Sequence, residues 1–185
     1  MTIEDDITHR SADIRWPDGL RPTEADLFAH NEIVIDATPE RIWQRLIAAT
    51  DWPNWYINAS NVVVNDPSEL LADGVTFDWT TFGLEISSTV VEFVQSARLG
   101  WYGRGKGLQA YHSWLLVARE HGTYVVMEEI GLGDAAKQLA QTDPGRMHTG
   151  HDLWNLSLKF VCENRLAVTG TPLPTHQPTK AGATS

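Results

Sequence analysis

The stretch that decides the fold is residues 30–56, which read HNEIVIDATPERIWQRLIAATDWPNWY. Residues 30–35 have the β-branched, alternating character of a half-buried strand. Thr38 is a suitable helix N-cap, and the proline after it suits the first helical turn. A helix is therefore expected over residues 39–48, with its isoleucine and leucine on one face. A second short helix is expected to begin at residue 51.

The rest of the chain predicts about six more strands and one long helix. Between residues 108–119 and 123–130, His121-Gly122 is expected to form a two-residue hairpin turn. Such connections make the sheet antiparallel, and its apolar face must be buried against the predicted helix, residues 147–164. The fold class is thus α+β, with an internal pocket expected between sheet and helix. The other expected strands are residues 61–65, 74–80, 84–94 and 98–103.

The two ends of the chain differ in composition from the middle. Residues 1–28 are polar and interrupted by Pro and Gly, so they are expected to form an irregular N-terminal arm. Residues 29–165 form the predicted domain. Residues 166–185 are rich in Thr, Pro, Gly and Ala, with little apolar surface to bury, so they are expected to be disordered and dispensable for folding.

Composition excludes several classes of function. The chain has 185 residues, with 14 Lys and Arg against 24 Asp and Glu, a net charge of −10. That charge disfavours nucleic acid and anionic membrane surfaces as partners. The single cysteine, Cys162, excludes an intrachain disulfide, and no apolar stretch is long enough to span a bilayer. A cytoplasmic monomer or homodimer is the expectation.

Four stretches together resemble the START/polyketide-cyclase superfamily. They are residues 32–56, residues 111–114 (YHSW), residues 122–131 (GTYVVMEEIG) and residues 150–163 (GHDLWNLSLKFVCE). The resemblance implies a helix-grip fold, in which a curved antiparallel sheet of about seven strands wraps a long C-terminal helix and two short helices follow the first strand. Members of this superfamily bind lipids, sterols, polyketides or hormones, activate chaperones, or catalyse cyclisation and dehydration.

Strand alternation predicts which polar side chains face the pocket. In the hairpin register above, Glu129 points inward opposite Trp114, and His112 is its diagonal neighbour. His151 shares a stripe of the long helix with Trp154 and is expected to face the same space. A carboxylate beside an imidazole raises the imidazole pKa and suits general acid–base chemistry, so His112 and Glu129 are the catalytic candidates. The alternative is that Glu129 is a structural, hydrogen-bonded carboxylate.

The remaining candidates are aromatic or apolar, and no metal is predicted. His148 and His151 are three residues apart beside Asp152, but spacing assigns no further ligand. Glu128 alternates with Glu129 and is expected to be solvated. The alternative for the tryptophan rings is that they only fill the core. The predicted ligand-binding residues are Trp79, Trp101, Trp114, Met127, His151 and Trp154.

Three functions remain open on the sequence. The first is binding of a hydrophobic, aromatic or polyketide-like or lipid-like small molecule, without a cofactor, which requires a cavity of about 300 Å³ or more. The second is a cyclase or dehydratase, which requires that cavity and a polar pair facing its ligand. The third is a protein-interaction module like the chaperone activators, which requires a filled interior and an exposed apolar patch.

Overall fold

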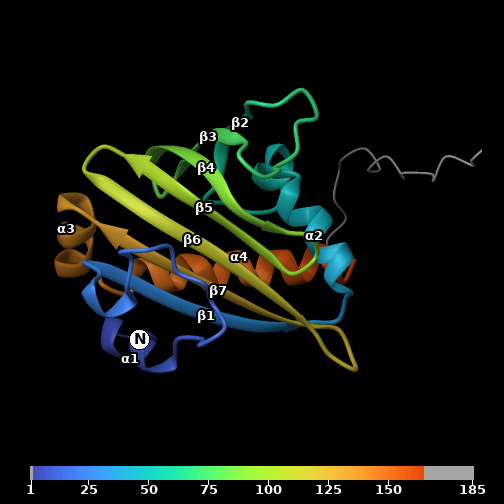
Figure 1. The fold of residues 1–185 in the computed structure, drawn as a ribbon, viewed down its shortest axis with the longest axis horizontal. Coiled ribbons are helices and arrows are strands. Elements are labelled where there is room, and N and C mark those ends of the chain that lie inside the picture. Colours follow the sequence, from blue (N-terminus) through green and yellow to red (C-terminus); the bar gives the residue numbers. More distant parts are fainter. Residues whose placement is uncertain (1, 165–185) are drawn as a thin grey trace, which may run out of the picture.

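An antiparallel sheet of seven strands curves around one long helix (Figure 1). The computed structural model describes residues 2–164. The strands lie in the order β1-β7-β6-β5-β4-β3-β2. Strands β2 to β7 are thus each paired with the next strand in the sequence, whereas β1 pairs with β7. Their bounds are β1 Leu27–Ile35, β2 Ser60–Val64, β3 Thr76–Thr81, β4 Leu84–Val94, β5 Arg98–Gly105, β6 Leu108–Ala118 and β7 Thr123–Leu132.

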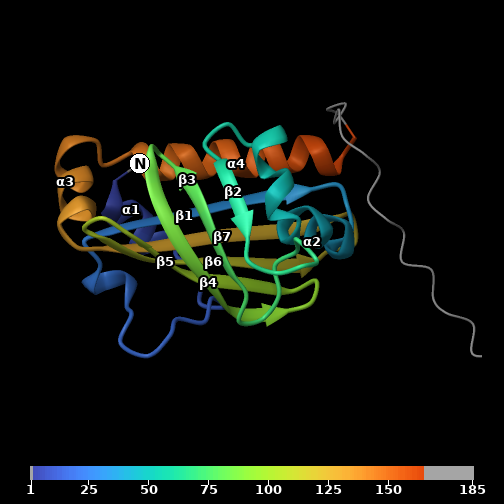
Figure 2. The ribbon, with the colours of Figure 1, turned by 90° about the horizontal axis from the view of Figure 1, so that it is seen from above.

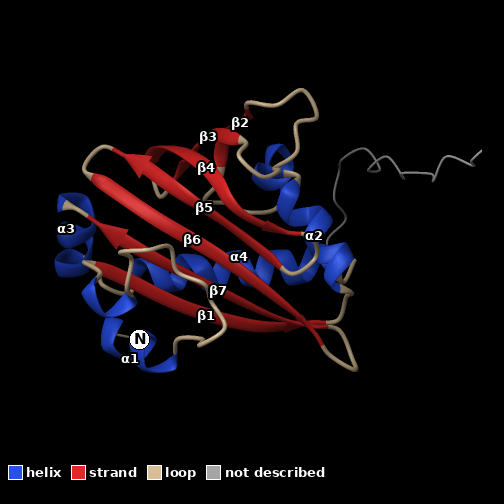
Figure 3. Cartoon of the chain, in the orientation of Figure 1, coloured by secondary structure: helices blue, strands red, loops and turns tan. Residues whose placement is uncertain are grey.

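The helices gather on one face and at the ends of the sheet. The long helix α4, Arg146–Cys162, lies over the sheet face that holds the core, as Figure 2 shows from above. Helix α2 and helix α3 lie near opposite ends of the sheet (Figure 3). The remaining helical segments and their bounds are α1 Ile3–His9, η1 Pro22–Glu24, α2 Pro39–Ile47, η2 Ala49–Asn54 and α3 Asp134–Thr142.

The predicted α+β helix-grip architecture is confirmed, and two helices were not predicted. Helix α1 begins with a capping box in which the Thr2 hydroxyl accepts from the Asp5 backbone and the Asp5 carboxylate accepts from the Thr2 backbone. Helix α3 follows Gly133, whose φ of 103° ends β7 abruptly. Both helices are short and bury few side chains, so neither shows the long apolar period that identifies a helix in sequence.

The β6–β7 hairpin differs from the predicted register by two residues. Ala118 pairs with Thr123, and the loop is the four residues between them rather than two. Gly122 closes this loop at φ 86°, and a Cβ there would lie 2.2 Å from the Ile35 carbonyl oxygen of β1. Consequently His112 is directly opposite Glu129, and Trp114 is opposite Met127. A shift of two keeps every side chain on its predicted face.

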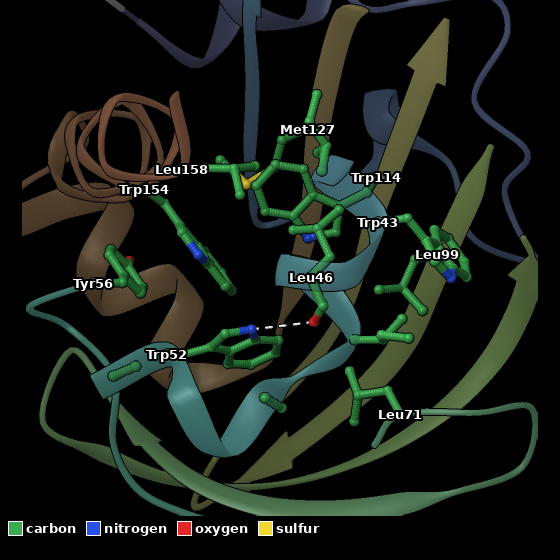
Figure 4. Close-up of a cluster of buried hydrophobic side chains, with 14 of the residues drawn as sticks. Trp43, Leu46, Trp52, Tyr56, Leu71, Leu99, Trp114, Met127, Trp154 and Leu158 are labelled. Carbon is green, nitrogen blue, oxygen red and sulfur yellow. Dashed lines mark hydrogen bonds between the residues drawn. The ribbon is translucent and has the colours of Figure 1, made fainter. Parts of the chain in front are cut away.

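Tryptophan dominates the core between the sheet and α4. Of the eight tryptophans, five are among the largest fully buried side chains: Trp43, Trp52, Trp101, Trp114 and Trp154. Figure 4 shows Trp52 donating its indole N–H to the Leu46 carbonyl oxygen at 3.1 Å. Trp154 stacks on Tyr56 with ring centroids 4.4 Å apart. Trp52 thus fills the space between the short helices and the sheet, where its ring meets Phe77 of β3 edge-on.

The N-terminal arm packs on the sheet face opposite α4. Ile14 is buried against Leu115 and Val126, and Trp16 contacts the rings of two further residues edge-on. Strand β1 begins two residues inside the predicted arm. The predicted disordered tail, residues 166–185, lies outside the described residues. Within residues 2–164, none of the helices combines the length and the apolarity that crossing a bilayer requires.

Candidate functional site

Three titratable side chains from three elements meet inside the domain. The His112 ring of β6 donates from Nδ1 to Glu129 Oε2 of β7 at 2.8 Å. The His151 ring of α4 donates from Nε2 to the same oxygen at 3.1 Å. An ionised carboxylate only accepts hydrogen bonds, so both imidazoles must carry their proton on the nitrogen that faces it. We call these three residues the His–Glu–His cluster.

Two members of the cluster, Glu129 and His151, line a small apolar pocket. The pocket has a volume of about 70 Å³ and is lined by residues of β1, β3 to β7, the β3–β4 turn, α3 and α4. Glu129 and His151 are the polar, titratable side chains in its lining. The other lining residues are Leu27, Trp79, Thr81, Phe82, Leu84, Ile86, Trp101, Gly103, Leu108, Ala110, Gly131, Ala135, Ala136, Leu139, Met147 and Trp154.

The structure divides the predicted site residues into two groups. Trp79, Trp101, Glu129, His151 and Trp154 line the pocket, as the alternation and the helix stripe indicated. Three others do not line the pocket and are buried in the packed interior instead: His112, Trp114 and Met127.

The packing of the aromatic core keeps these three side chains out of the pocket. The Trp101 ring stacks on the His112 ring, with centroids 4.5 Å apart and planes 9° apart, and thus covers the imidazole. Trp114 and Met127 are completely buried in the main core cluster, and the Trp114 ring meets Trp154 edge-on at 5.3 Å. The sequence identifies the inward face of a strand, but not where along that face the space is filled.

Sequence reasoning missed the walls that close the pocket. Phe82, at φ 50°, and Gly83, at φ 79°, form the two-residue turn between β3 and β4. The Phe82 ring packs so closely on α4 that a Cβ on Gly150 would lie 2.2 Å from its Cζ. The other wall is α3, through Ala136 and Leu139. The glycine at position 83, between two β-rich segments, is the sequence signal for the turn; no such signal marks α3.

Burial and hydrogen bonding set the charge of the cluster. Burial raises the pKa of Glu129, but the hydrogen bonds and partial charges of His112 and His151 outweigh it and hold that pKa well below its usual range. Burial also lowers the pKa of His112, and this effect exceeds the opposing effect of Glu129. The carboxylate does raise the His112 pKa, as expected, but burial lowers that pKa by more. At neutral pH the carboxylate is ionised and His112 is neutral.

Several buried polar atoms near the cluster have no hydrogen-bond partner among the described residues. They include His112 Nε2, His151 Nδ1, Trp154 Nε1 and both side-chain polar atoms of Asn155. Buried polar atoms in folded proteins are nearly always paired with protein, water or a ligand. The interior around the cluster is therefore suited to a bound polar group.

A second polar cluster lies at the β1 edge of the sheet. Glu128, expected to be solvated, is instead fully buried because the N-terminal arm covers it. Its Oε1 accepts hydrogen bonds from His30 Nδ1 at 2.7 Å and from the Ser11 backbone N–H at 2.5 Å. Nearby, His148 pairs with Asp6 of α1 at 2.9 Å. These contacts attach the arm to β1, β7 and α4.

The comparisons with known proteins agree with this architecture. No family model and no curated protein matches the chain. Among solved structures, one START superfamily protein from Mycobacterium smegmatis matches with a TM-score of 0.59 and 10% identity, over 75% of this chain and 99% of that one. The di-domain ARO/CYC protein StfQ of the steffimycin biosynthetic pathway matches with a TM-score of 0.60 and 14% identity, over 76% of this chain and 52% of that one. The chain thus has the START/polyketide-cyclase-like helix-grip fold.

A third solved structure defines the family more narrowly. The hypothetical protein jhp0584 from Helicobacter pylori is 31% identical, with a TM-score of 0.76, and the match covers 83% of this chain and 98% of that one. The chain belongs to the same family as this Helicobacter pylori protein, within the START/polyketide-cyclase-like fold.

Proposed function

We propose that the protein binds a small hydrophobic molecule carrying one polar group. The observation that supports this is the composition of the pocket, whose apolar and aromatic lining ends at Glu129 and His151. Pockets of this kind bind a ligand by burying its apolar surface and orient it through a few polar contacts. Aromatic, polyketide-like or lipid-like molecules have this chemistry.

The volume limits the size of that ligand. At about 70 Å³, the pocket is roughly a quarter of the ~300 Å³ at the lower end of ordinary ligand pockets. It accommodates a small molecule or one end of a larger one. A larger ligand requires Phe82 and α3 to move apart, and both lie at the pocket wall rather than in the central sheet.

Native mass spectrometry of the purified protein tests the proposal by detecting a co-purified molecule. Titration with aromatic compounds can then be followed by tryptophan fluorescence, because Trp79, Trp101 and Trp154 line the pocket. Ala135→Phe fills the pocket from α3 and should abolish binding. Gln138→Phe, on the exposed face of the same helix, is the matched control and should leave binding unchanged. Equal binding by both variants would place the ligand elsewhere.

The second candidate function is acid–base catalysis of the cyclase or dehydratase type. The hydrogen-bonded pair of Glu129 and His112 favours it, because proton abstraction beside a carbonyl needs a positioned base and a donor for the developing oxyanion. In this site Glu129 would be the base and His151 the donor. The lowered pKa of Glu129 makes the carboxylate a weak base at neutral pH, and for that reason we place binding first.

The third candidate, an interaction module, has one observation in its favour. Leu153, Leu156 and Phe160 follow one another on the outward face of α4 and are 38–45% exposed. Sedimentation velocity over a range of concentrations would show whether two chains associate through this face. Association that Leu156→Glu abolishes would support the module, whereas a monomer at all concentrations would count against self-association.

A further inference from the structure

We propose that the His–Glu–His cluster binds a divalent transition metal ion of the class of Zn²⁺ or Fe²⁺. The inference goes beyond the proposed function, because an ion can bind to these three residues whether or not an organic molecule enters the pocket. Residue spacing alone indicates no metal site, because the three ligands are far apart in the sequence. The fold instead brings one ligand from each of β6, β7 and α4.

The distances within the cluster are those of a nearly formed metal site. One ligand atom from each residue lies within 4.8 Å of the other two. Metal–nitrogen and metal–oxygen bonds are about 2.1 Å long, so ligands at octahedral or tetrahedral angles are roughly 3.0–3.4 Å apart. The Glu129 Oε2 atom is 2.8 Å from His112 Nδ1 and 3.1 Å from His151 Nε2. To admit an ion, the two imidazole nitrogens, which lie within 4.8 Å of each other, need to come within about 3.4 Å.

The surroundings hold the ligands in place. The His112 and His151 rings are 3% and 1% exposed, and the stacked Trp101 ring restricts the orientation of the first. Ligand imidazoles usually donate their second N–H to a partner. Here His112 Nε2 and His151 Nδ1 have no such partner among the described side chains, so a buried water would have to fill that role.

The ligand set selects the class of metal. Two imidazoles and one carboxylate bind zinc in catalytic sites and non-haem Fe²⁺ in oxygenases, and both kinds of site keep positions open for water or substrate. The carboxylate also supplies one negative charge toward the ion. Because Glu129 and His151 line the pocket, an open coordination position would face the space where the polar group of an organic ligand lies.

A cluster that only stabilises the fold would have the same geometry. The experiment therefore has to distinguish a metal-binding cluster from a purely structural one. Metal-free protein is titrated with Zn²⁺ alone by calorimetry and with Co²⁺ alone by visible absorption. We expect one ion per chain. His151→Gln and Glu129→Gln should each weaken binding by at least about 100-fold, the upper end of the loss seen when an outer-shell partner is removed.

His148→Gln is the matched control. His148 is one turn earlier on α4, pairs with Asp6 and Asp152 in the second polar cluster, and should not affect the affinity. His151→Cys provides a variant that retains a ligand, and with Co²⁺ it should add a thiolate charge-transfer band. The proposal is overturned if Zn²⁺ and Co²⁺ do not bind, if Glu129→Gln binds as tightly as the natural protein, or if only His148→Gln loses the ion.

Discussion

Replacing His30 by alanine should lower the free energy of unfolding by more than the loss of a single hydrogen bond would. His30 is 6% exposed and donates to Glu128, whose side chain has no exposed surface. After the replacement, the carboxylate keeps only the backbone N–H of Ser11, and its other oxygen already has no described partner. A buried charge deprived of its partner costs about 3–5 kcal/mol. Both groups are buried, so screening by solvent hardly reduces this energy.

That cost is a large part of the stability of such a domain, which is about 5–15 kcal/mol. At about 2–4 °C per kcal/mol for a chain of this size, the melting temperature should fall by roughly 6–20 °C. Urea unfolding and calorimetry measure the two quantities independently. His121→Ala is the matched control, because His121 is 89% exposed and should change stability by less than about 0.5 kcal/mol.

The double variant His30→Ala/Glu128→Gln tests the cause. It removes the unpaired charge, so it should recover part of the stability that the single variant loses. The reasoning is refuted if His30→Ala costs less than about 1 kcal/mol at an unchanged urea slope. It is also refuted if the double variant is no more stable than the single one.

Three further predictions concern the pocket and the pH. Glu129→Gln should stay folded and weaken binding of the pocket ligand, measured by melting and titration on one sample; a lowered melt with unchanged binding would show a structural role alone. Gly150→Ala should lower the melting temperature, because the new methyl group displaces the Phe82 ring. The overpacking costs about 1–3 kcal/mol, which exceeds the helix-propensity gain of about 1 kcal/mol. A raised melting temperature would contradict the close packing. Burial lowers the pKa of His30, but the hydrogen bond and charge of its carboxylate partner outweigh it and raise that pKa. The stability from this pair should therefore be complete below pH 6.5 and decrease as the pH rises through the raised pKa, and His30→Gln should remove this slope.

The side of the sheet that each strand residue faces could be predicted from the sequence more reliably than the residue that lies opposite it. Strand alternation has a period of two, so Glu129 was placed inward although the assumed hairpin loop was two residues too short. Direct pairing with His112 depended on the loop between Ala118 and Thr123, where Gly122 meets the end of β1. That contact joins residues almost ninety positions apart, and no local pattern records it.

The burial of Glu128 could not be predicted either, because it also depends on a contact between distant parts of the chain. Alternation places Glu128 on the face away from α4, and such a face is ordinarily solvated in an antiparallel sheet. The N-terminal arm covers it, yet the arm has no periodicity that would indicate a docking surface. The pocket was predicted from the architecture, whereas its volume depends on how Phe82, α3 and the tryptophans pack.

The pairing of β1 with β7 has a consequence for the order in which the domain is built. Strands β2 to β7 are joined by successive hairpins, so each can pair with the strand just made. Strand β1 is synthesised before them, but its partner, residues 123–132, is made about ninety residues later. On the ribosome, β1 therefore has no strand to pair with until β7 emerges, and we expect the closing of this long-range contact to be slow. The same step brings Glu128 against His30, so this buried pair forms only when the sheet is complete.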